Sequence, residues 1–207
     1  MRTIGWAALA AAAFAGTAAQ AKGDLDATIV RTTYGIPHVS ADSWEGIGYG
    51  VAYAYAQDNL CLLAEEFVTI AGERSLHFGP EAKSGQVDNL TSDVFMRAMI
   101  DLPRLREGAD AQGREANLLA AGYVAGYNRY LRDIGPEGAP AECRGKAWVR
   151  PITMDDMLRL TEKQMLLASA LQFIPAIANA APPGMPAQAN DAGMPDPDAP
   201  KLGSNGW

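Results

Sequence analysis

The fold expected for this chain is decided by residues 42–70, DSWEGIGYGVAYAYAQDNLCLLAEEFVTI. Its apolar side chains recur at spacings of three and four, at Tyr49, Ala52, Ala56, Leu60, Leu63, Phe67 and Ile70. Such spacing is typical of one buried face of a helix. Asp42 stands three residues before Glu45, a capping-box arrangement, and three glycines in the first turns allow close packing. The stretch therefore predicts one long helix that begins near residue 42.

Short strands are expected just before this helix. Residues 28–33 are mostly β-branched, Tyr34 and Gly35 can form a turn, and residues 37–40 read as extended again. This pattern predicts a hairpin or two short strands. After the helix, residues 77–86 (HFGPEAKSGQ) are expected to form a loop.

Three further helical regions follow. Pro103 divides residues 89–105, so short helices are expected there rather than one long helix. Thr153 is expected to cap a later helix that runs to about Ile174, where Pro175 ends or bends it. Between these regions a second helical stripe ends at Gly135-Pro136 and contains Leu119, Tyr123, Tyr127, Tyr130 and Ile134.

Composition and charge describe a globular protein without a nucleic-acid signature. Hydrophobic residues make up 48% of the 207 residues, and the formal net charge is −7. No basic stripe is present, which argues against nucleic-acid binding. An acidic surface indicates solubility but does not identify a substrate.

The first 21 residues resemble a secretory signal peptide. One arginine precedes an alanine-rich apolar run, and Ala19-Gln20-Ala21 fits a small-x-small cleavage site. A short membrane anchor is the alternative, although the run is too short to span comfortably. No later segment has about 18 consecutive apolar residues. We therefore expect a periplasmic or secreted protein without a membrane span.

Export gives the two cysteines a chemical context. In an oxidising compartment Cys61 and Cys143 are a natural disulfide pair, and two free thiols are the alternative. Closing a loop of roughly 80 residues would stabilise the fold by about 4–5 kcal/mol. Two cysteines and two histidines at scattered positions do not resemble a zinc-ligand set.

The usual catalytic signatures are weak in the body of the chain. His38 is expected to be a strand residue and His77 a loop residue, and either role is more typical here than that of a catalytic base. No G-x-S-x-G motif is present. Adjacent carboxylates such as Asp155 and Asp156 point in different directions on a helix, so they do not form a two-carboxylate site.

The last seven residues, KLGSNGW, follow a segment rich in proline and poor in large apolar residues. That segment is expected to be an exposed, removable linker. Cutting the chain before Ser204 would free an α-amino group with a pKa of about 8 on the same residue as the hydroxyl. The amine could then act as the base that a serine nucleophile needs. Gly203 places no side chain in the way of attack on its carbonyl carbon.

Four stretches resemble the penicillin acylase family of N-terminal-nucleophile hydrolases. They are residues 31–60 (RTTYGIPHVSADSWEGIGYGVAYAYAQDNL), 71–79 (AGERSLHFG), 141–153 (AECRGKAWVRPIT) and 203–207 (GSNGW). The sequence is most similar to the acyl-homoserine-lactone and aculeacin-type branch. In this family an exported precursor cuts itself into a small helix-rich α chain, a spacer and a large β chain that begins with serine.

The resemblance implies a domain plan and an α+β fold class. Residues 1–21 would be the signal peptide, 22–180 the α chain, 181–203 the spacer and 204–207 the start of the β chain. The chain would be the helix-rich α part of an αββα fold, with short N-terminal strands and without the β-chain core. As it stands, it is expected to be a fragment or a shortened reading frame, inactive alone.

The resemblance also implies a reaction and a site. The complete enzyme would be a linear amide hydrolase acting on an N-acyl amide, in quorum quenching or antibiotic metabolism, with the β chain as partner. Ser204 would be the nucleophile after autoproteolysis at Gly203. Side chains near the end of the third long helix would wall the acyl pocket, namely Met165, Leu166, Leu171 and Phe173. No cofactor is expected, but calcium occurs in some relatives and the resemblance leaves it open here, with no ligand identified in this chain.

A different class of function remains as the alternative from the residues alone. An exported helical binding or scaffold module with a disordered tail would have the same composition, and Ser204 would then have no role. The coding sequence downstream of residue 207 discriminates between the two, because only the acylase requires a large β chain.

Overall fold

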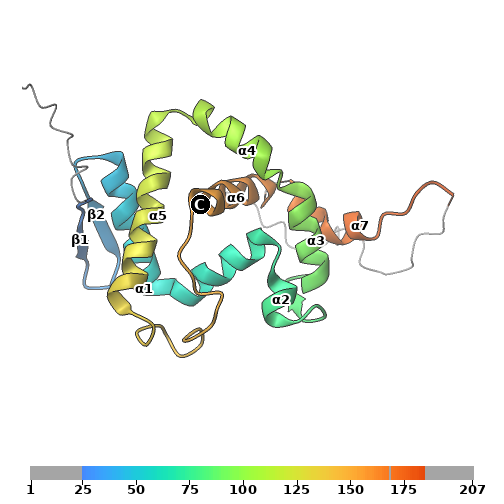
Figure 1. Cartoon of the computed structure of the whole chain (residues 1–207), viewed down its shortest axis with the longest axis horizontal. Coiled ribbons are helices and arrows are strands. Elements are labelled where there is room, and N and C mark those ends of the chain that lie inside the picture. Colours follow the sequence, from blue (N-terminus) through green and yellow to red (C-terminus); the bar gives the residue numbers. More distant parts are fainter. Residues whose placement is uncertain (1–24, 168, 185–207) are drawn as a thin grey trace, which may run out of the picture.

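The computed structural model describes residues 25–167 and 169–184, and helices dominate this part of the chain (Figure 1). The elements, in chain order, are β1 (Thr28–Arg31), β2 (Pro37–Ser40), α1 (Trp44–Ala71), α2 (Arg74–Phe78), β3 (Lys83–Ser84), β4 (Val87–Asp88), α3 (Asn89–Met99), α4 (Leu102–Ala109), the 3-10 turn η1 (Asp110–Gln112), α5 (Arg114–Ile134), α6 (Met154–Leu167), the 3-10 turn η2 (Ala170–Phe173) and α7 (Ile174–Ala178). The expected helix-rich fold with short N-terminal strands is therefore present. The predicted signal peptide, most of the predicted spacer, and both Gly203 and Ser204 lie outside the described residues.

The predicted N-terminal hairpin forms and is tied to α1. β1 pairs antiparallel with β2, and Thr28 lies opposite Ser40. Arg31, at the end of β1, donates hydrogen bonds of 3.0 Å to Asp58 and 3.0 Å to Gln57, both on α1. The hairpin therefore covers one side of the first half of α1 (Figure 1).

α1 forms as the apolar stripe predicts, but its first residue is capped differently. The N-cap is Ser43, whose side chain accepts a hydrogen bond of 3.0 Å from the backbone N–H of Gly46, so the expected capping role of Asp42 is wrong by one residue. The helix ends at Gly72, which has a left-handed φ of 65°. Asn59 departs from helical dihedrals and produces a kink inside the helix.

Glycines let α1 and α5 pack with their backbones in contact. A Cβ atom added at Gly122 would lie 1.8 Å from the carbonyl oxygen of Glu45, and one at Gly126 would lie 2.1 Å from that of Tyr49. On α1, a Cβ at Gly48 would lie 2.0 Å from the carbonyl oxygen of Leu119. The two helices run side by side in Figure 1. No residue with a side chain would permit this approach.

The hydrophobic core lies where α1, α3, α5 and α6 meet. Apart from Tyr49, which is half-buried, the α1 stripe is buried as predicted, and Tyr127 of α5 is fully buried beside Phe67 with ring centroids 5.5 Å apart. Cys61 and Cys143 form a disulfide with Cα atoms 5.5 Å apart, as expected from the sequence. The bond fixes the connection between α5 and α6 to the second half of α1.

Two sequence expectations about local structure are wrong. Residues 77–86 are not a simple loop, because His77 lies in α2 and β3 and β4 form a small hairpin. The helix after Thr153 ends at Leu167, and Pro175 lies in the first turn of α7 instead of ending a helix. Proline is tolerated in a first turn because the N–H that it lacks has no helical partner there. The predicted division of residues 89–105 is correct, since α3 ends at Met99 and α4 begins at Leu102.

Candidate functional site

The four predicted pocket residues lie together at the end of α6 and in η2, but they face in different directions. Leu166 is only 6% exposed and belongs to the core. Leu171 is half-buried and packs against that core. Met165 is 65% exposed and Phe173 is 46% exposed. The structure thus divides the group into one inward side chain, one intermediate side chain and two that project outward.

Two hollows flank this end of α6. The first, of about 280 Å³, lies between α1, α3 and the end of α6, and Leu171 contributes to its wall. Its lining mixes the apolar Leu62, Leu167 and Met96 with charged side chains. The second, also about 280 Å³, lies between α1, α5 and α6. Leu62 belongs to both hollows and is 62% exposed, so the described chain leaves it largely uncovered.

An ion pair stands between these two hollows. Lys163 of α6 donates a hydrogen bond to the Glu66 carboxylate of α1, and both side chains are largely shielded from solvent. In the second hollow, burial and the neighbouring Tyr55 raise the pKa of Tyr123 to about 12. The Tyr123 phenol therefore stays protonated at neutral pH and cannot act as a base there.

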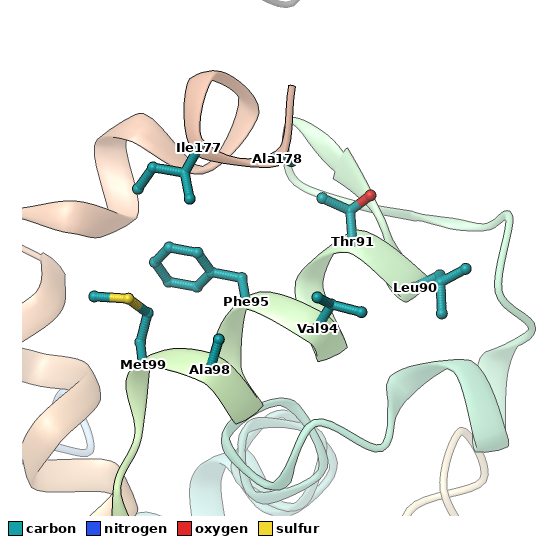
Figure 2. A pocket seen from close by; sticks show the side chains of 8 residues that line it. All are labelled: Leu90, Thr91, Val94, Phe95, Ala98, Met99, Ile177 and Ala178. Carbon is teal, nitrogen blue, oxygen red and sulfur yellow. The ribbon is translucent and has the colours of Figure 1, made fainter. Parts of the chain in front are cut away.

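A third hollow is a groove between α3 and α7, with a volume of about 400 Å³ (Figure 2). Its walls carry no charged side chain and are formed by Leu90, Thr91, Val94, Phe95, Ala98, Met99, Ile177 and Ala178. Because η2 leads directly into α7, this groove adjoins the segment that carries Phe173.

A buried arginine holds α2 between α1 and α3. The side chain of Arg74 donates to Asn89 at 2.8 Å and to Thr69 at 2.9 Å, and it forms an ion pair with Glu65 at 2.8 Å. The Asp93 carboxylate of α3 accepts the backbone N–H of Arg74 at 2.8 Å. Because the charge of Arg74 is paired and hydrogen-bonded, the cluster can stay buried. The Arg74 cluster is a structural anchor beside the first hollow.

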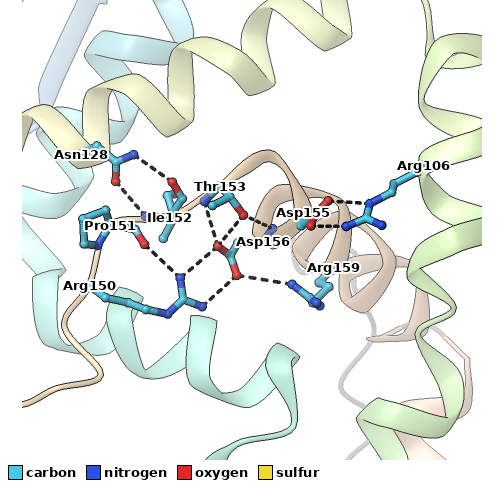
Figure 3. Close-up of polar contacts among 9 residues, drawn as sticks. All are labelled: Arg106, Asn128, Arg150, Pro151, Ile152, Thr153, Asp155, Asp156 and Arg159. Atoms are coloured by element: carbon cyan, nitrogen blue, oxygen red, sulfur yellow. Dashed lines mark hydrogen bonds and ion pairs between the residues drawn. The ribbon is translucent and has the colours of Figure 1, made fainter.

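Asp156 anchors the beginning of α6 (Figure 3). Its carboxylate accepts hydrogen bonds from Arg150 at 3.0 and 3.1 Å and from the backbone N–H of Thr153 at 2.8 Å. Asp156 is 2% exposed, and this burial by itself raises the pKa of its carboxyl. The hydrogen bonds from Arg150 and Thr153 outweigh burial, so the net pKa lies below its ordinary value of 3.8.

The neighbouring carboxylate, Asp155, makes a separate contact. Arg106 of α4 donates to it through two nitrogens, at 2.9 and 2.5 Å, as Figure 3 shows. This hydrogen bonding, supported by the positive charge of Arg106, lowers the pKa of Asp155. Asp155 and Asp156 therefore bind different arginines, which agrees with the sequence argument that they do not form a two-carboxylate site. Both contacts tie the beginning of α6 to neighbouring segments of the chain.

The two histidines of the chain do not lie together in the described residues. His38 lies in β2 and His77 in α2, at opposite sides of the molecule (Figure 1). Over residues 25–167 and 169–184, no cluster of three or more histidine, cysteine, aspartate or glutamate side chains is placed to hold a metal ion. No helix in that part is long and apolar enough to cross a membrane.

Sequence reasoning missed the polar contacts that fix this region. The Glu66–Lys163 pair joins residues 97 positions apart, and Arg74 reaches Asn89 across 15 positions. Neither pair leaves a local pattern. The Thr153–Asp156 contact did have a local signal, because a threonine three residues before an acidic side chain is a capping arrangement.

Comparison with known proteins places the chain in a family. Residues 26–207 match the family model described as penicillin amidase. The chain is 43% identical over 196 residues to an acyl-homoserine lactone acylase PvdQ of Pseudomonas putida, covering 94% of this chain and 25% of that protein. It is 36% identical over 182 residues to the aculeacin-A acylase of Actinoplanes utahensis, covering 84% of this chain and 23% of that protein.

A solved structure agrees with the sequence relatives. The fold is similar to a chain of the thermostable penicillin G acylase from Alcaligenes faecalis, with a TM-score of 0.61 and 26% identity, over 74% of this chain and 80% of that one. The chain spans about a quarter of the length of the two curated acylases. Because the family match extends over nearly the whole sequence, the chain belongs to the penicillin amidase family.

Proposed function

We propose that this chain is the α-chain part of an exported precursor of an N-acyl amide hydrolase, with Ser204 as its nucleophile. The observation that carries the proposal is the family match, which runs through Gly203-Ser204 to residue 207. The names of the relatives favour acyl-homoserine lactones or an aculeacin-type acylated molecule as the substrate class.

The first step in the proposed mechanism is autoproteolysis. The Ser204 hydroxyl attacks the carbonyl carbon of Gly203, the peptide C–N bond breaks, and the Ser204 nitrogen gains a proton to become a free amine. Water then hydrolyses the resulting ester, leaving the Gly203 carboxylate and restoring the hydroxyl. In this scheme residues 1–21 are the signal peptide, 22–180 the α chain, 181–203 the spacer, and Ser204 begins the β chain of an αββα fold.

The second step is turnover of an N-acyl amide. The free amine of Ser204 accepts the hydroxyl proton, directly or through one water, as the oxygen attacks the amide carbonyl. The leaving amine takes the proton, and an acyl-enzyme ester remains on Ser204. Water hydrolyses that ester, releases the acyl group as a carboxylic acid and restores the hydroxyl. The large β chain supplies the remaining groups of the site.

The α chain would contribute to the acyl pocket through the end of α6. Met165 and Phe173 are exposed in the described chain, and Leu171 lines a hollow, so these side chains are available to a substrate or to the β chain. Leu166 packs inward and would support the wall from behind. The clamps on Asp155 and Asp156 hold the helix that presents them.

The proposal is tested with the full-length precursor. Wild-type protein should be cut so that N-terminal sequencing of the large chain begins Ser-Asn-Gly, whereas Ser204→Ala should remain uncut and inactive. Ser40→Ala is the matched control, because Ser40 is an exposed serine at the end of β2. A large chain that begins elsewhere, or full cleavage in Ser204→Ala, would refute the mechanism.

A further inference from the structure

The groove between α3 and α7 has an apolar lining that is partly exposed to solvent. Figure 2 shows Ile177 of α7 above and Phe95 of α3 below, with Val94 and Leu90 along the same side of α3. Phe95 is 5% exposed and forms the floor, whereas Val94 is 61% exposed and Leu90 is 54% exposed. Ile177 on the opposite wall is 45% exposed. The three exposed side chains, Val94, Leu90 and Ile177, keep much of their apolar surface in water within the described chain, and a partner that covered them would remove that surface from water.

Two more exposed apolar side chains lie in the segment of chain that leads into α7. Phe173, at the end of η2, immediately precedes α7 and is 46% exposed. Leu167, at the end of α6, is also 46% exposed. The groove therefore adjoins the segment that the proposed function assigns to the acyl pocket. A partner that covered both would be positioned by the groove next to that pocket.

Two segments of this chain are poor candidates to fill the groove. Residues 1–24 lead into β1, which lies on the side of the molecule opposite α3 and α7 (Figure 1). The predicted spacer, residues 181–203, is rich in proline and contains three aspartates. The groove lining has no cation to pair with those carboxylates. An acidic segment with few large apolar side chains does not match an apolar groove of about 400 Å³.

We infer that this groove is the docking site for the large chain that begins at Ser204, which seats an apolar segment between Val94 and Ile177. The inference rests on the proposed function, because it takes the β chain as the partner. It is supported by the length of the relatives, about four times the part that this chain matches. It is also supported by position, since α7 is the last described helix before the chain leads toward Ser204. The groove would then hold the two chains together after the spacer is removed.

The test is photocrosslinking in the full-length Ser204→Ala precursor, which stays uncut under the proposed mechanism. Benzoylphenylalanine is incorporated in place of Val94, whose exposure allows the larger side chain without disturbing the core. The matched control carries the same group in place of Glu107, on the exposed face of α4, a helix without buried residues. Crosslinked peptides are identified by mass spectrometry, and a mixture of isotope-labelled and unlabelled protein distinguishes links between copies.

The inference predicts that position 94 crosslinks within one molecule to a peptide beyond residue 207, with a yield at least about fivefold above position 107. Links from position 94 to residues 181–203, links between copies, or no yield above the control would each overturn it. N-terminal sequencing of the wild-type large chain tests the proposed function separately. Correct cleavage with no link from position 94 refutes only the docking site, and a link without cleavage at Ser204 refutes only the mechanism.

Discussion

Gly122→Ala should separate the two longest helices and destabilise the fold. The added Cβ would lie 1.8 Å from the carbonyl oxygen of Glu45, 2.7 Å from its carbonyl carbon and 2.9 Å from the amide nitrogen of Tyr49. All three atoms belong to the α1 backbone, so no side chain can rotate away to make room. Contact would be relieved only if α1 and α5 moved apart locally by roughly 1.4 Å, since a carbon and an oxygen seldom approach within about 3.2 Å.

The expected cost follows from two opposing effects. Overpacking a well-packed interface typically costs about 1–3 kcal/mol, and occasionally more, while alanine gains about 1 kcal/mol over glycine in a helix. Because the clash is with backbone and the same movement would loosen the contacts at Gly48 and Gly126, we expect a cost above that usual range, about 4 kcal/mol, and so a net loss of about 3 kcal/mol. For a domain of this size that corresponds to a Tm lower by about 6–12 °C.

The assay is thermal unfolding of residues 22–207, with the disulfide intact, followed by circular dichroism. Gly108→Ala is the matched control, because Gly108 lies within α4 and a Cβ there would meet no atom within 4 Å. That substitution should raise the Tm slightly, as expected from helix propensity alone. If Gly122→Ala were as stable as Gly108→Ala, the close backbone packing of α1 on α5 would be refuted.

Four further substitutions test the other parts of the structure. Cys61→Ser should lower the free energy of unfolding by about 2–5 kcal/mol in denaturant titrations, and reduction of the wild type should have the same effect. Asp156→Asn should cost about 2–3 kcal/mol at pH 7, less than a fully buried pair because Arg150 is 38% exposed. The folded pKa of Asp156 lies below its ordinary 3.8, so the stabilisation from its carboxylate is present above about pH 4 and is lost as the pH falls through the folded pKa. Denaturant titrations at pH 7 and pH 3 should therefore show a smaller decrease in the free energy of unfolding in Asp156→Asn than in the wild type. In the complete enzyme, Phe173→Ala should shift the preferred acyl length, and kcat/KM should change by about fourfold, or about 0.8 kcal/mol, for each methylene of the acyl chain. Leu166→Ala should instead lower stability and reduce kcat/KM equally at every acyl length.

The sequence by itself determined the elements whose signals are local. The apolar stripe through residues 49–70 predicted α1, because helical periodicity depends only on neighbours three and four positions apart. The end of α5 at Gly135 was predicted for the same kind of reason, as was the hairpin around Gly35. For the candidate site, sequence and family resemblance led to the proposal of Ser204 and the end of α6, which stays a prediction. They also paired Cys61 with Cys143, because the chain has only two cysteines.

Only the tertiary structure decided the features that join distant parts of the chain. The helix at Arg74 was missed because its first backbone N–H groups, those of Arg74 and Ser75, donate to the Asp93 carboxylate. Asp93 lies 19 and 18 residues, respectively, further along the chain. Leu166 is buried because it joins a core built from helices distant in sequence, whereas Phe173 is left 46% exposed. The glycines of α5 gave no sign of their partner, because a glycine contributes no side chain to a hydrophobic pattern. In each case the deciding contact is with a residue far away in sequence, and no local spacing can encode that contact.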